Sequence, residues 1–515
     1  MASPKMTEPV HLLVLVHGMW GNTTHLAEMA RIAEETLCSN VQDPVHILLA
    51  EANHEEGTYD GIDWCAERVA SEIIREIHRL QIEQHRPVRK FSITGYSLGG
   101  LVSRYIVGIL AQRGFFAALE GNTESDPNMI LMTPMNFNTI ATPHIGLIRY
   151  PTLFSSLAHA LGPKLLSRTG EQFYLNDDWS GNGRPLLDIL SDPTLVFYQA
   201  LTRFKQVRIF ANAVNDNTVP YVTAAIEEKD PFVDWNIDDG GLNVKFHPKY
   251  QPIISSYTRT SPLSYNQPAQ IAPGKKKSKR SKPLLNLPPI LMQPFPWNII
   301  IYMLLPVLIP LVFVVVFVKF TRATSRSRQR IRLLEKSETG ENSLTSVLGA
   351  RLKEGVDYIG RIEKRIEDAV ADIVDDPRSI DTSGSETELP PVTSGTSTPS
   401  ASLLYGSVSG IYSSSSAGSK LSASFDQPAA PLSSKSTHGP SLTPLQRTIC
   451  VRLNSIPGLK KELAFIDSAD PIDSAKLRRP MRNSHATIVS RDVKNYEFHR
   501  IGEGVLRCWA DGLIV

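Results

Sequence analysis

A serine between two glycines stands in a pattern that suits a catalytic nucleophile. Gly95-Tyr96-Ser97-Leu98-Gly99 fits Gly-x-Ser-x-Gly, with the apolar runs FSIT and LVSRYIVGIL on either side. A strand, a tight turn and a helix in this order are the context that the motif requires. Side chains in place of Gly95 and Gly99 would collide in the turn. The pattern therefore predicts that Ser97 attacks an acyl carbonyl, and the flanking runs argue against an inert serine in a glycine-rich turn.

A second segment could bind the oxyanion that forms during such an attack. The sequence HGMWG, residues 17–21, follows the first apolar run of the chain. We predict that the backbone N–H groups of Met19 and Leu98 form the oxyanion hole, because Gly18 lets the chain approach the substrate closely. The N-terminus of the helix after Ser97 would also favour negative charge. The alternative is a simple turn at the end of a strand.

The acid and the base of a catalytic triad are expected later in the chain, in the order Ser, Asp, His. Asp216 follows the strand candidate VRIFANAV and is the predicted acid, unless it serves only an Asx-turn. Asp188 and Asp192 compete with it but follow no comparable strand. His485 is the predicted base because it stands in a short polar turn before an apolar run. The competing histidines are His247, His438 and His499.

Alternating strands and helices must position these residues. The strand candidates are residues 11–16, 45–50, 91–95, 136–142 and 207–214. Apolar residues recur at helical spacing from Ile62 to Leu80, and residues 101–110 read as a buried helix. This alternation predicts the α/β class, with a mostly parallel sheet covered on both faces.

An uncharged apolar segment interrupts the pattern. No charged residue occurs from Pro283 to Val318, and Ile299 to Val318 is long enough to cross a bilayer. Basic blocks at residues 275–282 and 319–332 flank the segment and would attract anionic head groups. We therefore expect contact with a membrane or a lipid droplet through residues 284–318. The alternative is a buried core helix.

The place of this segment in the chain limits its topology. A single transmembrane helix would put His485 on the opposite side of the membrane from Ser97, and the triad could not form. We therefore predict a re-entrant or hairpin insertion, with Pro306 and Pro310 supplying the bend and both ends in the cytosol.

Shifts in composition divide the chain into five parts. Residues 1–250 and 441–515 have globular composition and are predicted to form one hydrolase core, which the other three parts interrupt. Residues 251–335 hold the membrane segment, and residues 336–375 read as an amphipathic helix. Residues 376–440 are rich in Ser, Thr, Gly and Pro, which predicts a disordered linker.

Charge and cysteine content exclude other functions. The net charge is only +2 over 515 residues, which gives no sign of a nucleic-acid-binding protein. The basic blocks border an apolar run, which favours membrane contact over a role in nuclear import. The four cysteines show no metal-ligand spacing, so we expect no metal and no cofactor. The scattered cysteines also favour a reduced, cytosolic compartment. The polar N-terminus has no apolar stretch, so we expect no secretory signal.

Five stretches resemble the fungal serine esterases, a family of lipase-like α/β hydrolases related to the lipid-droplet phospholipase. They are LVHGMWGN (15–22), GYSLGGLVSRY (95–105), FNTIATPHIG (137–146), NDNTVPYVTAA (215–225) and NSHATIV (483–489). The resemblance implies an α/β-hydrolase fold with Ser97, Asp216 and His485 as its triad. It also implies cleavage of acyl esters in glycerophospholipids or acylglycerols. The implied location is a lipid droplet or the endoplasmic reticulum membrane, with the catalytic domain facing the cytosol.

Other functions of the same residues stay open at this point. The triad could serve acyl transfer or the deacylation of S-acylated proteins, or the chain could be a lipid-surface scaffold without activity. Tyr96 stands where histidine is common in lipases, and we expect little effect from it. His144 is expected to be a packed or hydrogen-bonded loop residue without a catalytic role.

Overall fold

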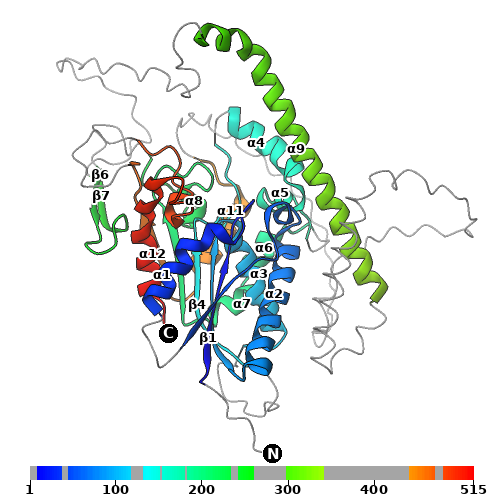
Figure 1. Cartoon of the computed structure of the whole chain (residues 1–515), viewed down its shortest axis with the longest axis vertical. Helices are drawn as coiled ribbons and strands as arrows, with labels where there is room; N and C mark the ends of the chain where they lie inside the picture. The colour runs from blue at the N-terminus through cyan, green and yellow to red at the C-terminus, as the bar shows by residue number, and fades with distance from the viewer. Residues whose placement is uncertain are drawn as a thin grey trace, which may run out of the picture.

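A six-stranded parallel sheet lies at the centre of the fold (Figure 1). Its strand order is β2-β1-β3-β4-β5-β8, and every neighbouring pair runs parallel. The strands are β1 Val10–Val16, β2 Val45–Leu49, β3 Val88–Tyr96, β4 Thr133–Ile140, β5 Gln206–Asn212 and β8 Leu459–Ala464. The computed structural model describes residues 8–37, 44–116, 131–150, 153–179, 183–233, 242–259, 297–341, 440–469 and 480–515.

Helices cover both faces of the sheet, and alternate residues of β1 show how. Leu12 and Val14 pack in one hydrophobic core with α2 (Ile62–His78) and α3 (Leu98–Gln112). Leu13 and Leu15 face the opposite core, which includes α1 (Ala27–Leu37) and α12 (Glu503–Asp511). Because successive side chains of a strand point to opposite faces, a run of apolar residues fills both cores.

The predicted α/β class and mostly parallel sheet are confirmed. Each of the five strand candidates corresponds to one of the strands β1 to β5. The sixth strand, β8, escaped prediction because its sequence LKKELA carries three consecutive charges at the edge of the sheet. Figure 1 shows that the C-terminal part of the chain, with α12, lies beside α1 from the N-terminal part.

Shorter elements complete the described part of the chain. The other α-helices are α4 Leu153–Leu165, α5 Ser167–Phe173, α6 Leu186–Ser191, α7 Val196–Thr202, α8 Tyr221–Ala224 and α11 Pro444–Asn454. The single-turn helices are η1 Thr23–Leu26, η2 Glu55–Tyr59, η3 Arg79–Glu83, η7 Thr487–Val489 and η8 Glu497–Gly502. Strands β6 Leu242–Phe246 and β7 Ile254–Arg259 pair as an antiparallel hairpin outside the main sheet.

The apolar segment belongs to one long helix, α9 (Trp297–Glu341), which runs along the outside of the fold around the central sheet (Figure 1). That fold, the described residues within 8–259 and 440–515, holds the predicted triad and is called the catalytic part below. Pro306 and Pro310 lie inside this helix, so the predicted hairpin bend at these prolines is wrong. A proline removes one backbone hydrogen bond, and a helix held by the bonds on either side continues past it. Within the described residues, no helix combines the length and the apolar character needed to cross a membrane.

Three predicted features lie partly or wholly outside the described residues. They include residues 284–296, the first part of the segment expected to contact a membrane, and residues 376–439, most of the expected linker. Of the expected amphipathic helix, only residues 336–341 are described, as the C-terminal end of α9.

Candidate active site

Ser97 stands on the turn that joins β3 to α3. Its backbone has φ +56° and ψ −124°, a left-handed conformation that a residue with a side chain rarely adopts. A Cβ on Gly95 would collide with the backbone of Gly99 and Gly100, and a Cβ on Gly99 would collide with the carbonyl oxygen of Val16. The two glycines therefore allow the tight turn that presents Ser97 at the edge of the sheet.

The three residues predicted as a triad meet at this edge. Ser97 Oγ lies 3.1 Å from His485 Nε2, and His485 Nδ1 lies 3.0 Å from Asp216 Oδ2. Each of the three residues is only 7% exposed. Ser97 follows β3 and Asp216 follows β5, and the carboxyl ends of parallel strands share one edge of a sheet. The arrangement allows proton transfer from the serine hydroxyl to the imidazole.

Asp216 is held by hydrogen bonds besides its contact with His485. Its Oδ1 accepts from the backbone N–H groups of Thr218 (3.0 Å) and Val219 (2.8 Å), which makes an Asx-turn. Its Oδ2 also accepts from the Asn212 side chain at 2.8 Å. The Asx-turn is therefore no alternative to the contact with His485, because the same carboxylate makes both.

The loop of His485 is tied to the loop of Asp216. The Ser484 N–H donates to the Asn215 carbonyl oxygen at 2.9 Å, and the Ser484 hydroxyl donates to the Val214 carbonyl oxygen at 2.9 Å. The Asn483 side chain donates to the Thr218 hydroxyl at 3.1 Å. These bonds explain how a histidine 269 positions after the acid is placed against it.

Tyr96 contacts the base, a role that the sequence analysis missed. Its hydroxyl donates to the His485 carbonyl oxygen at 2.9 Å, and the two ring centroids lie 5.1 Å apart. Burial raises the pKa of this phenol, so its proton stays in place as a donor at neutral pH. No pattern around Tyr96 indicated the contact, since its partner lies 389 positions away.

The segment predicted to form the oxyanion hole lies directly against Ser97. A Cβ on Gly18 would come within 2.8 Å of Ser97 Cβ, so only glycine fits there without a shift. Within the described residues, the backbone N–H groups of Met19 and Leu98 have no hydrogen-bond partner. Leu98 is also the first residue of α3, where a helix leaves its N–H groups free. Neither N–H group is therefore taken up by another acceptor in the described part of the chain.

The competing acids make structural ion pairs instead. Asp188 pairs with Arg184 and Arg452, each at 2.6 Å, and Asp192 pairs with Arg184 at 2.8 Å. These contacts link α6 to α11. Within the described residues, neither carboxylate contacts the candidate triad, and both serve the packing of these helices.

The other histidines also have local partners. His144 is buried and its Nε2 lies 2.9 Å from the Thr139 hydroxyl, as expected for a hydrogen-bonded loop residue. Burial lowers the pKa of His144 well below its ordinary value, which keeps the ring neutral. His247 stacks on Tyr250, and His499 accepts from a backbone N–H. His438 lies outside the described residues.

Comparison of the sequence with protein families finds one match. Residues 6–227 match the family model described as Putative serine esterase (DUF676). The matched residues include Ser97 and Asp216, whereas His485 lies beyond them. The resemblance to this family, inferred from the sequence, is confirmed over that stretch.

Curated fungal proteins are similar to the same part of the chain. Putative lipase C4A8.10 of Schizosaccharomyces pombe is 31% identical over 224 residues, which cover 42% of this chain and 26% of that protein. Putative lipase ROG1 of Saccharomyces cerevisiae is 27% identical over 250 residues, which cover 48% of this chain and 32% of that protein. The chain therefore spans about a quarter to a third of the length of these relatives. Among solved structures, phospholipase PlaB from Legionella pneumophila is similar with a TM-score of 0.24 and 13% identity, over 43% of each chain.

Proposed function

We propose that this protein is a serine hydrolase that cleaves acyl ester bonds of glycerophospholipids or acylglycerols. The observation that carries the proposal is the unbroken line of contacts from Ser97 Oγ through His485 to Asp216, at 3.1 and 3.0 Å. Free backbone N–H groups beside Ser97 and the match to a serine esterase family support the same reaction class.

The reaction follows from the roles that the geometry allows. His485 Nε2 accepts the proton of Ser97 Oγ as this oxygen attacks the ester carbonyl carbon. Asp216 orients the imidazole and stabilises its charged form. The N–H groups of Met19 and Leu98 bind the oxyanion, which collapses as the protonated His485 gives its proton to the leaving alcohol. A water molecule, deprotonated by His485, then hydrolyses the acyl-enzyme and releases the fatty acid.

The lipid substrate class is supported by apolar side chains beside the catalytic part. In the part of α9 before Lys319, the described apolar side chains that are exposed are Met303, Leu304, Leu311, Val314, Val315, Val316, Phe317 and Val318, which are 38% to 77% exposed. Helix α4, which contacts α9, exposes Leu157 and Leu161 as well. Exposed apolar side chains gathered in this way mark interaction surfaces, and a lipid surface fits them. The names of the two fungal relatives contain the word lipase, which agrees with this class.

Attachment to a lipid surface is part of the proposal. Residues 284–318 would enter the surface without crossing it, and basic residues next to the segment, such as the exposed Lys319 and Arg322, would contact anionic head groups. Each Lys or Arg near such a surface contributes roughly 1 kcal/mol. The proposed location is a lipid droplet or the endoplasmic reticulum membrane, with the catalytic part facing the cytosol.

The test of this proposal is an analysis of the cleavage products of purified protein in mixed micelles. The substrates are a diacyl phospholipid, a triacylglycerol and an S-acylated peptide, and Ser97→Ala is the control. We expect fatty acid release from at least one of the two lipids by the unmutated protein and none by Ser97→Ala. Release by both proteins would reject the proposed nucleophile. Activity restricted to the thioester, or transfer of the acyl chain to an alcohol, would reject lipid hydrolysis.

A further inference from the structure

The short helix η2 lies between the oxyanion segment and α9. On the side of the oxyanion segment, the Trp20 N–H donates to the Thr58 hydroxyl at 3.1 Å, and the Trp20 indole N–H donates to the Tyr59 hydroxyl at 2.9 Å. The Glu55 N–H also donates to the Gly21 carbonyl oxygen at 3.0 Å. Helix η2 therefore fixes the positions of Trp20 and Gly21.

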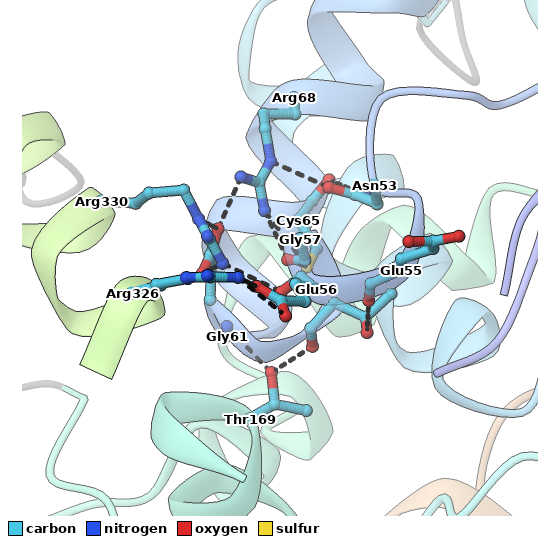
Figure 2. A network of polar contacts seen from close by, with 12 residues as sticks. Asn53, Glu55, Glu56, Gly57, Gly61, Cys65, Arg68, Thr169, Arg326 and Arg330 are labelled. Carbon is cyan, nitrogen blue, oxygen red and sulfur yellow. Dashed lines mark hydrogen bonds and ion pairs between the residues drawn. The ribbon is translucent and has the colours of Figure 1, made fainter. Parts of the chain in front are cut away.

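On the opposite side, η2 is bound by an arginine of α9 (Figure 2). Arg330 donates from Nη2 to Asp60 Oδ1 at 2.8 Å and from Nε to Asp60 Oδ2 at 3.1 Å. The same Nη2 donates to the Glu56 carbonyl oxygen at 2.9 Å. A planar guanidinium that meets a carboxylate with two parallel bonds fixes direction as well as distance. A lysine could not reproduce this contact.

Asp60 is the centre of a network of bonds within the fold. Its side chain is completely buried, and its second partner is Arg68 of α2, whose Nη1 lies 2.7 Å from Asp60 Oδ2. Arg68 also donates to the Gly57 carbonyl oxygen and to the Asn53 side chain (Figure 2). A buried ion pair contributes little net stability, but a completely satisfied one admits few other arrangements. The network therefore specifies where η2 lies.

Helix α9 also meets the oxyanion segment directly. The rings of Phe320 and Trp20 pack edge to face, with 6.1 Å between the ring centroids. The Thr324 hydroxyl donates to the Leu165 carbonyl oxygen at 2.6 Å, which fixes α9 against the end of α4. The α9 residues buried against the catalytic part are Ala323, Thr324, Ser327, Ile331 and Leu334.

We propose that α9 positions the oxyanion hole, with Arg330 and Asp60 as positioning residues and Phe320 as a direct contact. Trp20, next to Met19, has φ +54°, a left-handed conformation that persists in a residue with a side chain only when its surroundings enforce it. The contacts from η2 and Phe320 are those surroundings. The inference rests on the proposed function, because it concerns the same oxyanion hole. It means that the helix proposed to attach to lipid also holds the catalytic backbone in place.

The test compares Arg330→Met with Arg328→Met in the whole 515-residue chain, purified in detergent. Arg328 stands on the same helix, is half exposed and reaches a single acid, Glu171, at 3.9 Å. We measure kcat and KM for a soluble short-chain ester, per active site titrated with a fluorophosphonate. We also measure the affinity for a trifluoromethyl ketone, whose adduct with the serine places an oxyanion in the hole.

We expect Arg330→Met to lower kcat about tenfold or more, with KM within about twofold, since complete loss of one oxyanion donor costs roughly 10²- to 10³-fold. The affinity for the ketone should fall by a similar factor, while the pH profile stays unchanged because His485 and Asp216 are untouched. Arg328→Met should match the unmutated protein. A merely structural role of Arg330 would lower the melting temperature and the number of titrated sites, but not kcat per site or ketone affinity.

Phe320→Ala serves as the second variant if Arg330→Met does not fold, and the same loss of kcat and of ketone affinity is expected. A folded Arg330→Met or Phe320→Ala protein with unchanged kcat per site and unchanged ketone affinity would overturn the inference. The proposed function has its own control in Ser97→Ala. If Ser97→Ala is inactive while these variants are fully active, only the positioning role is wrong. If Ser97→Ala keeps its activity, the proposed function is wrong as well.

Discussion

At the scale of single residues, the site depends on backbone segments that pass so close to Ser97 that only glycine fits at several positions. Ser97 is held in a left-handed conformation, which costs on the order of 1–3 kcal/mol and persists because its neighbours enforce it. Gly18, Gly95 and Gly99 are the neighbours that make room for this turn. A methyl group at any of them would meet backbone or Ser97 itself.

Gly18→Ala tests the approach of the oxyanion segment to the nucleophile. Its Cβ would lie 2.8 Å from Ser97 Cβ, so either Ser97 or the Met19 N–H must move. We expect kcat/KM for a short-chain ester to fall roughly 100-fold or more, as for loss of one oxyanion donor. Gly57→Ala is the matched control, because its Cβ meets nothing within 4 Å and leaves η2 in place. Equal activity of the two variants would show that the segment does not contribute to the hole.

Tyr96→Phe tests the contact between the elbow and the base. The substitution leaves the His485 carbonyl oxygen without its donor, which should lower the free energy of unfolding by about 1–3 kcal/mol. Because His485 would be held less firmly, we also expect kcat to fall roughly tenfold, which corresponds to an increase of about 1.4 kcal/mol in the activation free energy. Urea unfolding and steady-state kinetics measure the two effects.

Tyr198→Phe provides the comparison for that substitution. Tyr198 is also largely buried, and its hydroxyl makes no hydrogen bond to the residues that the structure describes. We expect it to keep kcat and to change stability little. If Tyr96→Phe behaves like Tyr198→Phe in both measurements, Tyr96 has no role beyond packing.

At the scale of elements, helices beside the site are joined by polar contacts in the core. Asp63 near the start of α2 receives bonds from Arg168 and Gln172 of α5 and from the Trp179 indole. Burial alone would raise the pKa of Asp63, but the charge and hydrogen bonds of Arg168 and Gln172 outweigh it and hold this pKa below its ordinary value. The charged carboxylate of Asp63 therefore links α2 to α5.

Asp63→Asn should lower stability in a way that depends on pH. A carboxyl group with a lowered pKa in the folded state stabilises the fold above its unfolded pKa of about 3.9, and this stabilisation is lost as the pH falls through the folded value. We expect the variant to lose about 1–3 kcal/mol of unfolding free energy at pH 7 and the deficit to narrow below about pH 4. Urea unfolding from pH 7 to pH 3 measures it, with the exposed Glu34→Gln as control. A deficit that stays constant over this range would contradict the assignment.

Patterns within one element were enough to predict much of the fold. Apolar runs gave the strands β1 to β5, and the glycines around Ser97 gave the turn into α3. Charges hid β8, whose Lys460, Lys461 and Glu462 lie at the sheet edge where solvent is near. Pro306 and Pro310 suggested a bend, yet local hydrogen bonding carries α9 past them. The helix or strand propensity of a residue describes one position, whereas the structure that this residue adopts also depends on its neighbours.

Apart from the contacts within the triad, contacts between distant elements could not be predicted from the sequence. The order Ser, Asp, His and the resemblance singled out His485, which the structure places beside Ser97. Nothing comparable pointed to the bond from Tyr96 to His485 or to that from Arg330 to Asp60. Each joins residues hundreds of positions apart through the fold alone, and neither belongs to a short motif.

At the scale of the whole molecule, the candidate active site is assembled from two separated parts of the chain. Ser97 and Asp216 precede α9, and His485 follows it. The C-terminal part reaches the site because β8 pairs with β5 and α12 packs beside α1. The C-terminal half of α9 packs on the catalytic part (Figure 1). Described side chains of its N-terminal half are exposed.

Deletion of residues 284–318 tests this division of α9. The deletion removes the exposed apolar residues and keeps Phe320, Thr324 and Arg330, which dock α9. We expect release from phospholipid vesicles in a flotation assay, with hydrolysis of a soluble short-chain ester within about threefold of the unmutated protein. A tenfold change would correspond to 1.4 kcal/mol of lost transition-state stabilisation.

The control is a deletion of the same length within residues 376–440, the Ser/Thr/Gly/Pro-rich stretch, which should leave vesicle binding unchanged. Unchanged binding after the deletion of 284–318 would place the lipid contact elsewhere. Loss of soluble-ester hydrolysis would show that the apolar half of α9 also supports the catalytic part.

The most direct test of the central claim is the rate at which Ser97→Ala hydrolyses a soluble short-chain ester. Without the hydroxyl, His485 and Asp216 have no nucleophile to activate, while the buried contacts around the turn stay in place. We predict that kcat falls by on the order of 10³-fold or more, with the thermal unfolding midpoint nearly unchanged. A correctly folded Ser97→Ala protein that hydrolyses the ester at the rate of the unmutated protein would contradict the assignment of Ser97 as the nucleophile.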